Sequence, residues 1–148
     1  MTGHDFLSLA LALAAGATEA EWRTAGSRAY YAAFHIARDL FRSLGFAVPR
    51  ADAAHKYLAF RLQNCGRAEL QQAGRDLDRL RDTRNQADYD LSPVFAQQRA
   101  HMSAALARQI IQTLPVATVE PTRTQVRDAI IAYERAAYGQ ITWRPPPP

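Results

Sequence analysis

The sequence predicts an all-α protein whose helices are joined by short loops. Ala, Leu and Arg are abundant and only 7 of the 148 residues are glycine, a composition that favours helix formation. Apolar residues recur at steps of three and four along most of the chain, as in helices with one buried face. No segment has the alternation of β-branched residues that a strand requires, and no internal repeat is present.

The first two helices are expected over residues 2–15 and 18–44. The second opens at the capping-box pattern Thr18 to Glu21, in which a hydroxyl and a carboxylate bind free backbone N–H groups. It should stop at Gly45, because glycine readily takes the left-handed conformation that ends a helix. Its apolar stripe consists of Tyr30, Phe34, Ala37, Phe41 and Leu44.

Three more helices are expected between residues 52 and 114. The third covers residues 52–64 and ends near Gly66, and the fourth covers residues 68–89. Ser92 and Pro93 form a good N-cap followed by a first-turn proline. They predict that the fifth helix begins there and runs to about residue 114.

We expect one helical domain over residues 1–114, since a chain of this length most economically forms a single domain. A linker rich in Val, Thr and Pro follows over residues 115–121, and a last helix over residues 122–139. The last helix either belongs to the core or packs on a partner or second subunit. Residues 140–148 end in four prolines and are expected to form a flexible, extended tail.

Charge and cysteine content limit the function classes. The formal net charge is +4, and all basic residues except Lys56 are arginines. The guanidinium group suits phosphate and carboxylate ligands, but solvated basic faces would explain the same composition. A single cysteine, Cys65, excludes an intrachain disulfide and a zinc cluster built from thiolates.

No pattern for a nucleotide, metal or membrane site is found. The chain contains no GxGxxG, GxxxxGK[ST] or GxSxG sequence, and its histidines lack metal-binding spacing. No metal and no cofactor are therefore expected. The apolar residues 6–17 are too few for a membrane span and lack the basic start of a signal peptide, so we expect a cytoplasmic protein without a membrane segment.

The most informative stretch runs from Arg84 to Tyr89, at the end of the fourth expected helix. Arg84 lies on the apolar stripe of that helix, and a buried cation must be paired or must bind a ligand. Asp88, four residues later, can pair with it along the helix surface. Alternatively, Arg84 faces a cleft and binds a phosphate, with Asn85 and Asp88 orienting it.

A second group of polar residues shares one face of the second helix. These residues are Ser27, Arg28, Tyr31, His35 and Arg38. Because His35 has an arginine on each side along this face, its protonated form is disfavoured, and it could act as a base near neutral pH. The alternative is an ordinary solvated basic face.

Together, two motifs resemble the HEPN superfamily (higher eukaryotes and prokaryotes nucleotide-binding). They are Ser-Arg-Ala-Tyr-Tyr-Ala-Ala-Phe-His over residues 27–35 and Arg-Asn-Gln-Ala-Asp-Tyr over residues 84–89. They are similar to a branch with a Tyr-Tyr-Ala-x-Phe helix and an Arg-x-x-Ala-Asp-Tyr helix end. The resemblance covers about residues 6–114. Pro49 and His55 also lie where that branch has a proline-containing loop and a histidine opening the third helix.

The resemblance implies an up-and-down bundle of four to five helices that commonly forms a homodimer. In catalytic members, each subunit contributes an Arg-x4–6-His pair to a metal-independent ribonuclease site. The histidine helps to activate the 2′-hydroxyl and the arginine stabilises the phosphate. Many members are toxins or phage-defence proteins, and several are encoded beside a small nucleotidyltransferase that acts as antitoxin.

This chain departs from the catalytic motif. The first and last positions where the histidine is expected hold Tyr89 and Leu91. Three alternatives stay open: His35 or His55 supplies an imidazole from another helix, Asp88 acts as the base, or the site binds RNA or a nucleotide without cutting it. In some toxin members a tyrosine near the motif is nucleotidylated by the partner enzyme, and Tyr89 is the candidate equivalent.

We therefore predict an RNA-directed toxin or defence protein, acting as a homodimer and as a metal-independent endoribonuclease. The alternatives are a non-catalytic module that binds a nucleotide, RNA or a nucleotidyltransferase, and a plain interaction scaffold. The candidate catalytic residues are Arg84, Asn85, Asp88 and His35. The candidate binding residues are Arg28, Tyr31, Arg38 and Tyr89.

Overall fold

The computed structural model describes residues 1–148 and consists of six α-helices and one 3₁₀ helix, which confirms the all-α prediction. The elements are α1 (Gly3–Ala14), α2 (Glu19–Leu44), α3 (Ala53–Gln63), α4 (Ala68–Tyr89), α5 (Gln97–Thr113), η1 (Leu114–Thr118) and α6 (Thr122–Tyr138). None of these helices is long and apolar enough to cross a membrane.

The chain divides into two compact units, and α2 and α4 contribute residues to both. Unit 1 contains residues 1–36 and 76–112, and unit 2 contains residues 37–75 and 113–148. Each unit is therefore assembled from two separate stretches of sequence.

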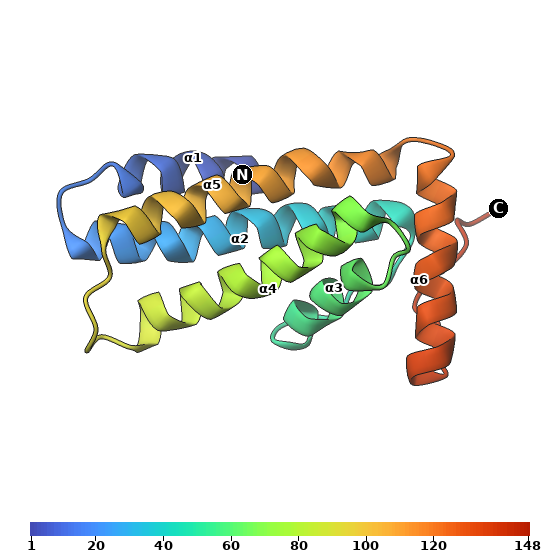
Figure 1. Ribbon diagram of the computed structural model, residues 1–148. Helices are drawn as coiled ribbons and strands as arrows, with labels where there is room; N and C mark the ends of the chain where they lie inside the picture. Colours follow the sequence, from blue (N-terminus) through green and yellow to red (C-terminus); the bar gives the residue numbers. More distant parts are fainter. The chain divides into compact units, whose positions relative to one another are not determined.

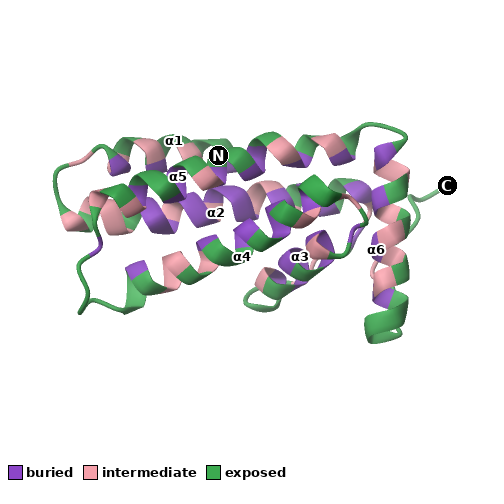
Figure 2. Cartoon of the chain, viewed as in Figure 1, coloured by how far each residue is buried: buried purple, intermediate pink, exposed green.

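Unit 1 is an up-and-down arrangement of four helical segments: α1, the first part of α2, the last part of α4, and α5 (Figure 1). Small residues let these segments approach closely. A Cβ atom on Gly3 would lie 2.7 Å from the backbone oxygen of Ala32, so α1 needs a glycine where it meets α2. Figure 2 shows buried residues along most of α2 and exposed residues on the outer faces of α1 and α5. At the opposite end, one apolar cluster joins Ala14, Ala25, Ala87, Phe95 and Ala100.

Helix α5 begins at Gln97, not at Ser92 and Pro93 as predicted. A helix starting at Pro93 needs the Pro93 carbonyl to accept the N–H of Gln97. Instead, that carbonyl accepts a hydrogen bond from Arg23 Nη2 at 2.6 Å. Tertiary contacts therefore override a strong local start signal and hold residues 92–96 as a loop.

Unit 2 contains the last helix and the start of the tail. In its core, Nε of Arg61 on α3 lies 2.9 Å from Oε2 of Glu134 on α6, and both side chains are buried. Glu134 also accepts hydrogen bonds from the backbone N and the hydroxyl of Thr142, at 2.9 and 2.6 Å. Helix α6 thus packs on α3 within one compact unit.

The segments expected to be a linker and a flexible tail both carry defined structure. Residues 115–118 of the expected linker, together with Leu114, form η1. The tail is anchored at its start, where Trp143 forms a bridge with Phe46 and its indole N–H donates to the Leu44 carbonyl at 2.9 Å. The four final prolines lie beyond this anchor and are exposed.

Candidate functional site

The two motifs singled out in the sequence meet where α2 and α4 pack against each other in unit 1. Asp88 on α4 joins them, because its Oδ2 accepts a hydrogen bond from the Ser27 hydroxyl on α2 at 3.1 Å. The same oxygen lies 3.1 Å from Nε of Arg84, which is the ion pair expected from their four-residue spacing. Ser27 is buried, so this contact fixes the position of the carboxylate.

Arg84 is held from several directions, and its side chain is 17% exposed. Its Nη1 donates to Oδ1 of Asn85 at 3.0 Å, and its Nη2 donates to the Tyr89 hydroxyl at 3.4 Å. Its Cζ lies 5.2 Å from the ring centre of Tyr31. Since each terminal nitrogen carries two hydrogens, both keep one N–H for a ligand after these contacts.

Arg28 differs from Arg84 because no carboxylate pairs with it. Its Nη2 donates to the Ser27 hydroxyl at 3.3 Å, and its Cζ lies 5.3 Å from the ring centres of both Phe6 and Tyr31. Its Nε is buried and makes no hydrogen bond. Arg28 is therefore a half-buried cation whose charge is balanced only by aromatic rings and one hydroxyl.

The guanidinium groups of Arg28 and Arg84 both lie near the ring of Tyr31. The Cζ atoms of Arg28 and Arg84 lie 5.3 and 5.2 Å from its centre. A cation over an aromatic face is favourable, but the ring removes no net charge. Because Asp88 pairs with Arg84, the positive charge left without an anionic partner is that of Arg28. We call Arg28, Tyr31, Arg84 and Asp88 the arginine cluster.

His35 lies beside the arginine cluster, within a group of aromatic rings. Its ring centre is 5.1 Å from that of Phe6, 5.4 Å from Phe34 and 6.1 Å from Tyr31. The Tyr31 ring is close both to His35 and to the guanidinium group of Arg84. The structure therefore brings seven of the eight candidate site residues into one region of unit 1: Arg28, Tyr31, His35, Arg84, Asn85, Asp88 and Tyr89.

Arg38, the eighth candidate, belongs to unit 2. Its Nε lies 3.7 Å from Oδ1 of Asp39, its neighbour in sequence. His55, the other imidazole considered, is also in unit 2, on α3. The periodicity that grouped Arg38 with Arg28 is real, but α2 is 26 residues long and contributes to both units.

Two further arginines of unit 1, Arg23 and Arg81, are not among the residues predicted from the sequence. Arg23 holds the end of α4, with hydrogen bonds from its guanidinium to the carbonyls of Gln86, Ala87 and Asp90. Arg81 lies one turn before Arg84 on the same face of α4. Sequence spacing carried a signal for Arg81. For Arg23 it indicated only the pair with Glu19, four residues before it, because the carbonyl partners of Arg23 are more than sixty residues away.

The charges of Arg81 and Arg84 act on a common neighbour, Tyr30. Burial raises the pKa of the Tyr30 phenol well above its ordinary value. The positive charges of Arg81 and Arg84 oppose this rise, whereas Tyr31 and the negative charge of Asp78 add to it. Arg81 is half-buried, and no carboxylate pairs with it.

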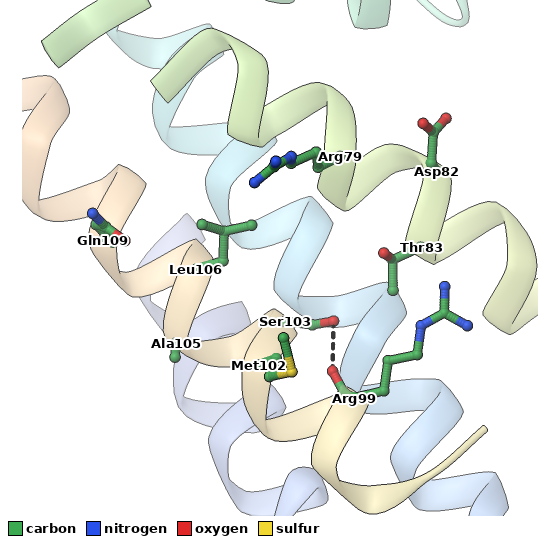
Figure 3. A pocket seen from close by; sticks show the side chains of 9 residues that line it. All are labelled: Arg79, Asp82, Thr83, Arg99, Met102, Ser103, Ala105, Leu106 and Gln109. Atoms are coloured by element: carbon green, nitrogen blue, oxygen red, sulfur yellow. Dashed lines mark hydrogen bonds between the residues drawn. The ribbon is translucent and has the colours of Figure 1, made fainter. Parts of the chain in front are cut away.

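A cavity lies elsewhere in unit 1, between α4 and α5 (Figure 3). It has a volume of about 560 Å³, with Met102 and Leu106 in its middle and Arg79 and Arg99 at its borders. None of the eight candidate site residues lines it. Its lining positions on α4 occupy the side of the helix opposite to Arg81, Arg84 and Asp88, so the cavity and the arginine cluster are separate features.

No group of three or more His, Cys, Asp or Glu side chains is placed to hold a metal ion. The ligand chemistry of the arginine cluster is that of an anion, since its free N–H donors and its excess charge come from guanidinium groups. A phosphate oxygen matches these donors in charge and geometry.

One of the three comparisons with known proteins gives a match. No curated protein and no solved structure gives a significant match. A protein-family model described as the HEPN domain matches residues 4–117, which include both motifs and all of unit 1 except its first three residues. The chain therefore belongs to the HEPN domain family.

Proposed function

We propose that this protein is an RNA-directed toxin or defence protein, and that Arg28 and Arg84 bind a phosphate of an RNA strand or nucleotide. HEPN domains are associated with nucleotide binding and with ribonuclease and toxin functions. Within this family, the arginine cluster is the part of the chain whose chemistry fits a phosphate. Asn85, Asp88 and Tyr89 hold Arg84 in place, and Tyr31 positions both guanidinium groups.

The observation that carries the proposal is the uncompensated charge of Arg28. Removing a guanidinium from water without an anionic partner costs free energy, and the Ser27 hydroxyl and the two rings offset only part of that cost. A phosphate bound next to Arg28 would supply the missing negative charge. Arg84 would bind the same group through the N–H donors that its protein partners leave free.

The second candidate function is metal-independent cleavage of RNA by a homodimer. In such a reaction the 2′-oxygen bonds to phosphorus while the bond from phosphorus to the 5′-oxygen of the next nucleotide breaks. A base removes the proton of the 2′-hydroxyl, and the leaving 5′-oxygen takes up a proton and becomes a 5′-hydroxyl. Tyr89 is one candidate for this base, because it stands at the first position expected for the motif histidine and its hydroxyl contacts Arg84. His35 is the alternative base, separated from Arg84 by the Tyr31 ring.

A nucleotidyltransferase antitoxin is the partner that the family suggests. Tyr89 is 72% exposed, so its hydroxyl is accessible for nucleotidylation. Modification there would place a negative charge against Arg84 and block the site.

Binding is tested with a fluorescent single-stranded RNA and the variants Arg28→Gln and Arg84→Gln. Each lost charge-assisted contact is worth about 1.5–3 kcal/mol, so each variant should bind about tenfold to a hundredfold more weakly. Arg79→Gln removes the same charge from the opposite side of α4 and should bind within about twofold of wild type. Equal affinity of all four proteins, each with unchanged helix content, would disprove the phosphate site.

Cleavage is tested in EDTA on the same RNA. Products with 2′,3′-cyclic phosphate ends from wild type, but not from Arg84→Gln, would support the second candidate. Tyr89→Phe and His35→Gln then identify the base, because only the variant lacking it should lose cleavage while keeping RNA affinity. Sedimentation of the wild-type protein tests the homodimer, which predicts twice the mass of the 16.5 kDa chain.

A further inference from the structure

We propose that Arg81 binds a second phosphate, next to the one bound by Arg28 and Arg84, so that the site takes an RNA strand rather than a free mononucleotide. This inference rests on the proposed function and specifies its ligand. The two motifs of the sequence do not contain Arg81, which was not among the candidate residues.

Arg81 and Arg84 lie close together along α4. Residues three apart on a helix are surface neighbours, with Cβ atoms about 5–6 Å apart. Arg81 and Arg84 are three apart, so their side chains leave the same face of α4. A chain of phosphates that contacts one of them along this face passes the other.

The charge of Arg81 is not paired with a carboxylate. Arg81 is half-buried, and neither Asp78, one turn before it, nor Asp82, next to it, forms an ion pair with it. Among Arg28, Arg81 and Arg84, only Arg84 has a carboxylate partner, Asp88. Two guanidinium groups thus remain without a carboxylate, which matches two phosphates better than one.

The third arginine of α4 in unit 1, Arg79, gives a contrast. Arg79 lies on the opposite side of the helix, is 75% exposed, and has Asp76 as a partner at 3.7 Å. It borders the cavity between α4 and α5 instead of the arginine cluster. Arg79→Gln is therefore a matched control: the same helix, the same charge change, and the wrong side for the proposed strand.

The test compares ligands with one and two phosphates. The probes are uridine 5′-monophosphate and the 5′-phosphorylated uridine dinucleotide with a 2′-O-methyl group, which cannot be cleaved through its 2′-oxygen. In wild type, the dinucleotide should bind about tenfold more tightly than the mononucleotide. Arg81→Gln should remove most of this gain and leave the mononucleotide affinity within about twofold. Arg79→Gln should keep the gain.

Salt dependence gives a second readout on a longer oligouridylate. Each phosphate contact with a single strand contributes about 0.7 to the slope of log affinity against log salt concentration. Arg81→Gln should lower that slope by about 0.7, and Arg79→Gln should leave it unchanged. This measurement counts ionic contacts and is insensitive to small losses of stability.

The outcomes separate this inference from the proposed function. If wild type binds neither ligand nor the oligouridylate, the proposed function fails. If wild type binds RNA but Arg81→Gln behaves like Arg79→Gln, only the second phosphate site is refuted. If Arg81→Gln weakens both ligands equally, Arg81 belongs to the first phosphate site and the inference is wrong.

Discussion

Replacing Arg23 should destabilise unit 1, although Arg23 lies outside both motifs. One guanidinium group holds the end of α4 and the loop to α5, with donor–acceptor distances to carbonyl oxygens between 2.6 and 3.3 Å. These carbonyls belong to Gln86, Ala87, Asp90 and Pro93. The last turn of a helix leaves carbonyls without partners, so Arg23 acts as a side-chain cap.

The perturbation is Arg23→Met, which keeps the packing volume of the stem and removes every hydrogen bond. The Arg23 side chain is 12% exposed and also pairs with Glu19 at 2.8 Å. A hydrogen bond to a charged group contributes about 1.5–3 kcal/mol, but several of these carbonyls are exposed and regain water. We therefore expect a loss of about 2–3 kcal/mol in the free energy of unfolding, or about 4–12 °C in Tm.

The assay is urea unfolding followed by far-ultraviolet circular dichroism. Arg108→Met is the matched control, because Arg108 is exposed on α5 and should change the free energy of unfolding by less than about 0.5 kcal/mol. Arg23→Lys keeps the charge but cannot reach four carbonyls with one ammonium group, so it should fall between wild type and Arg23→Met. If Arg23→Met is as stable as Arg108→Met, the capping argument is refuted.

Three further predictions concern other parts of the chain. Glu134→Ala should destabilise the protein by about 3–5 kcal/mol, because it leaves the buried Arg61 without its partner; thermal unfolding measures this, and the exposed Glu69→Ala serves as control. The pKa of Glu19 is lowered from its ordinary value of 4.5, first by the hydrogen bond from the Phe95 N–H and then by Arg23. Its stabilisation is therefore complete above pH 4.5 and is lost as the pH falls below that value, so the gap in unfolding free energy between wild type and Glu19→Gln should be largest at pH 7 and shrink in acid. Cys65 is buried and burial raises the pKa of its thiol, so a thiol reagent at pH 8 should label it at the rate of unfolding and much faster in urea.

The sequence predicted best those features that depend on neighbouring residues. The limits of α2 and α4 match the expected ones, because local signals mark them. The Thr18 hydroxyl accepts a hydrogen bond from the backbone N–H of Glu21 at 3.3 Å, and the Glu21 carboxylate accepts one from the backbone N–H of Thr18 at 2.9 Å. Gly45, which ends α2, has a φ of 103°, a value that a residue with a side chain rarely adopts.

The features that the sequence missed depend on distant partners. The start of α5 was wrong because Arg23 and Glu19 bind the backbone of the preceding loop. Arg81 and Asp78 are spaced for an intrahelical ion pair, so their spacing predicts a compensated charge at Arg81. Which ion pairs form is decided by how α4 packs on α2. Asp88 pairs with Arg84 and also binds Ser27, whereas Asp78 pairs with no arginine.

The arrangement around Asp88 separates two properties that the family often combines. Under the proposed function, phosphate binding depends on the uncompensated guanidinium groups and needs no histidine. Cleavage needs in addition a group that removes the 2′-hydroxyl proton, and the position of the motif histidine holds Tyr89. Replacing Tyr89 by histidine therefore tests the division directly. If binding and catalysis are separable here, Tyr89→His should raise the cleavage rate while RNA affinity changes by less than about threefold. If RNA affinity changes as much as the rate, the tyrosine belongs to the binding site itself.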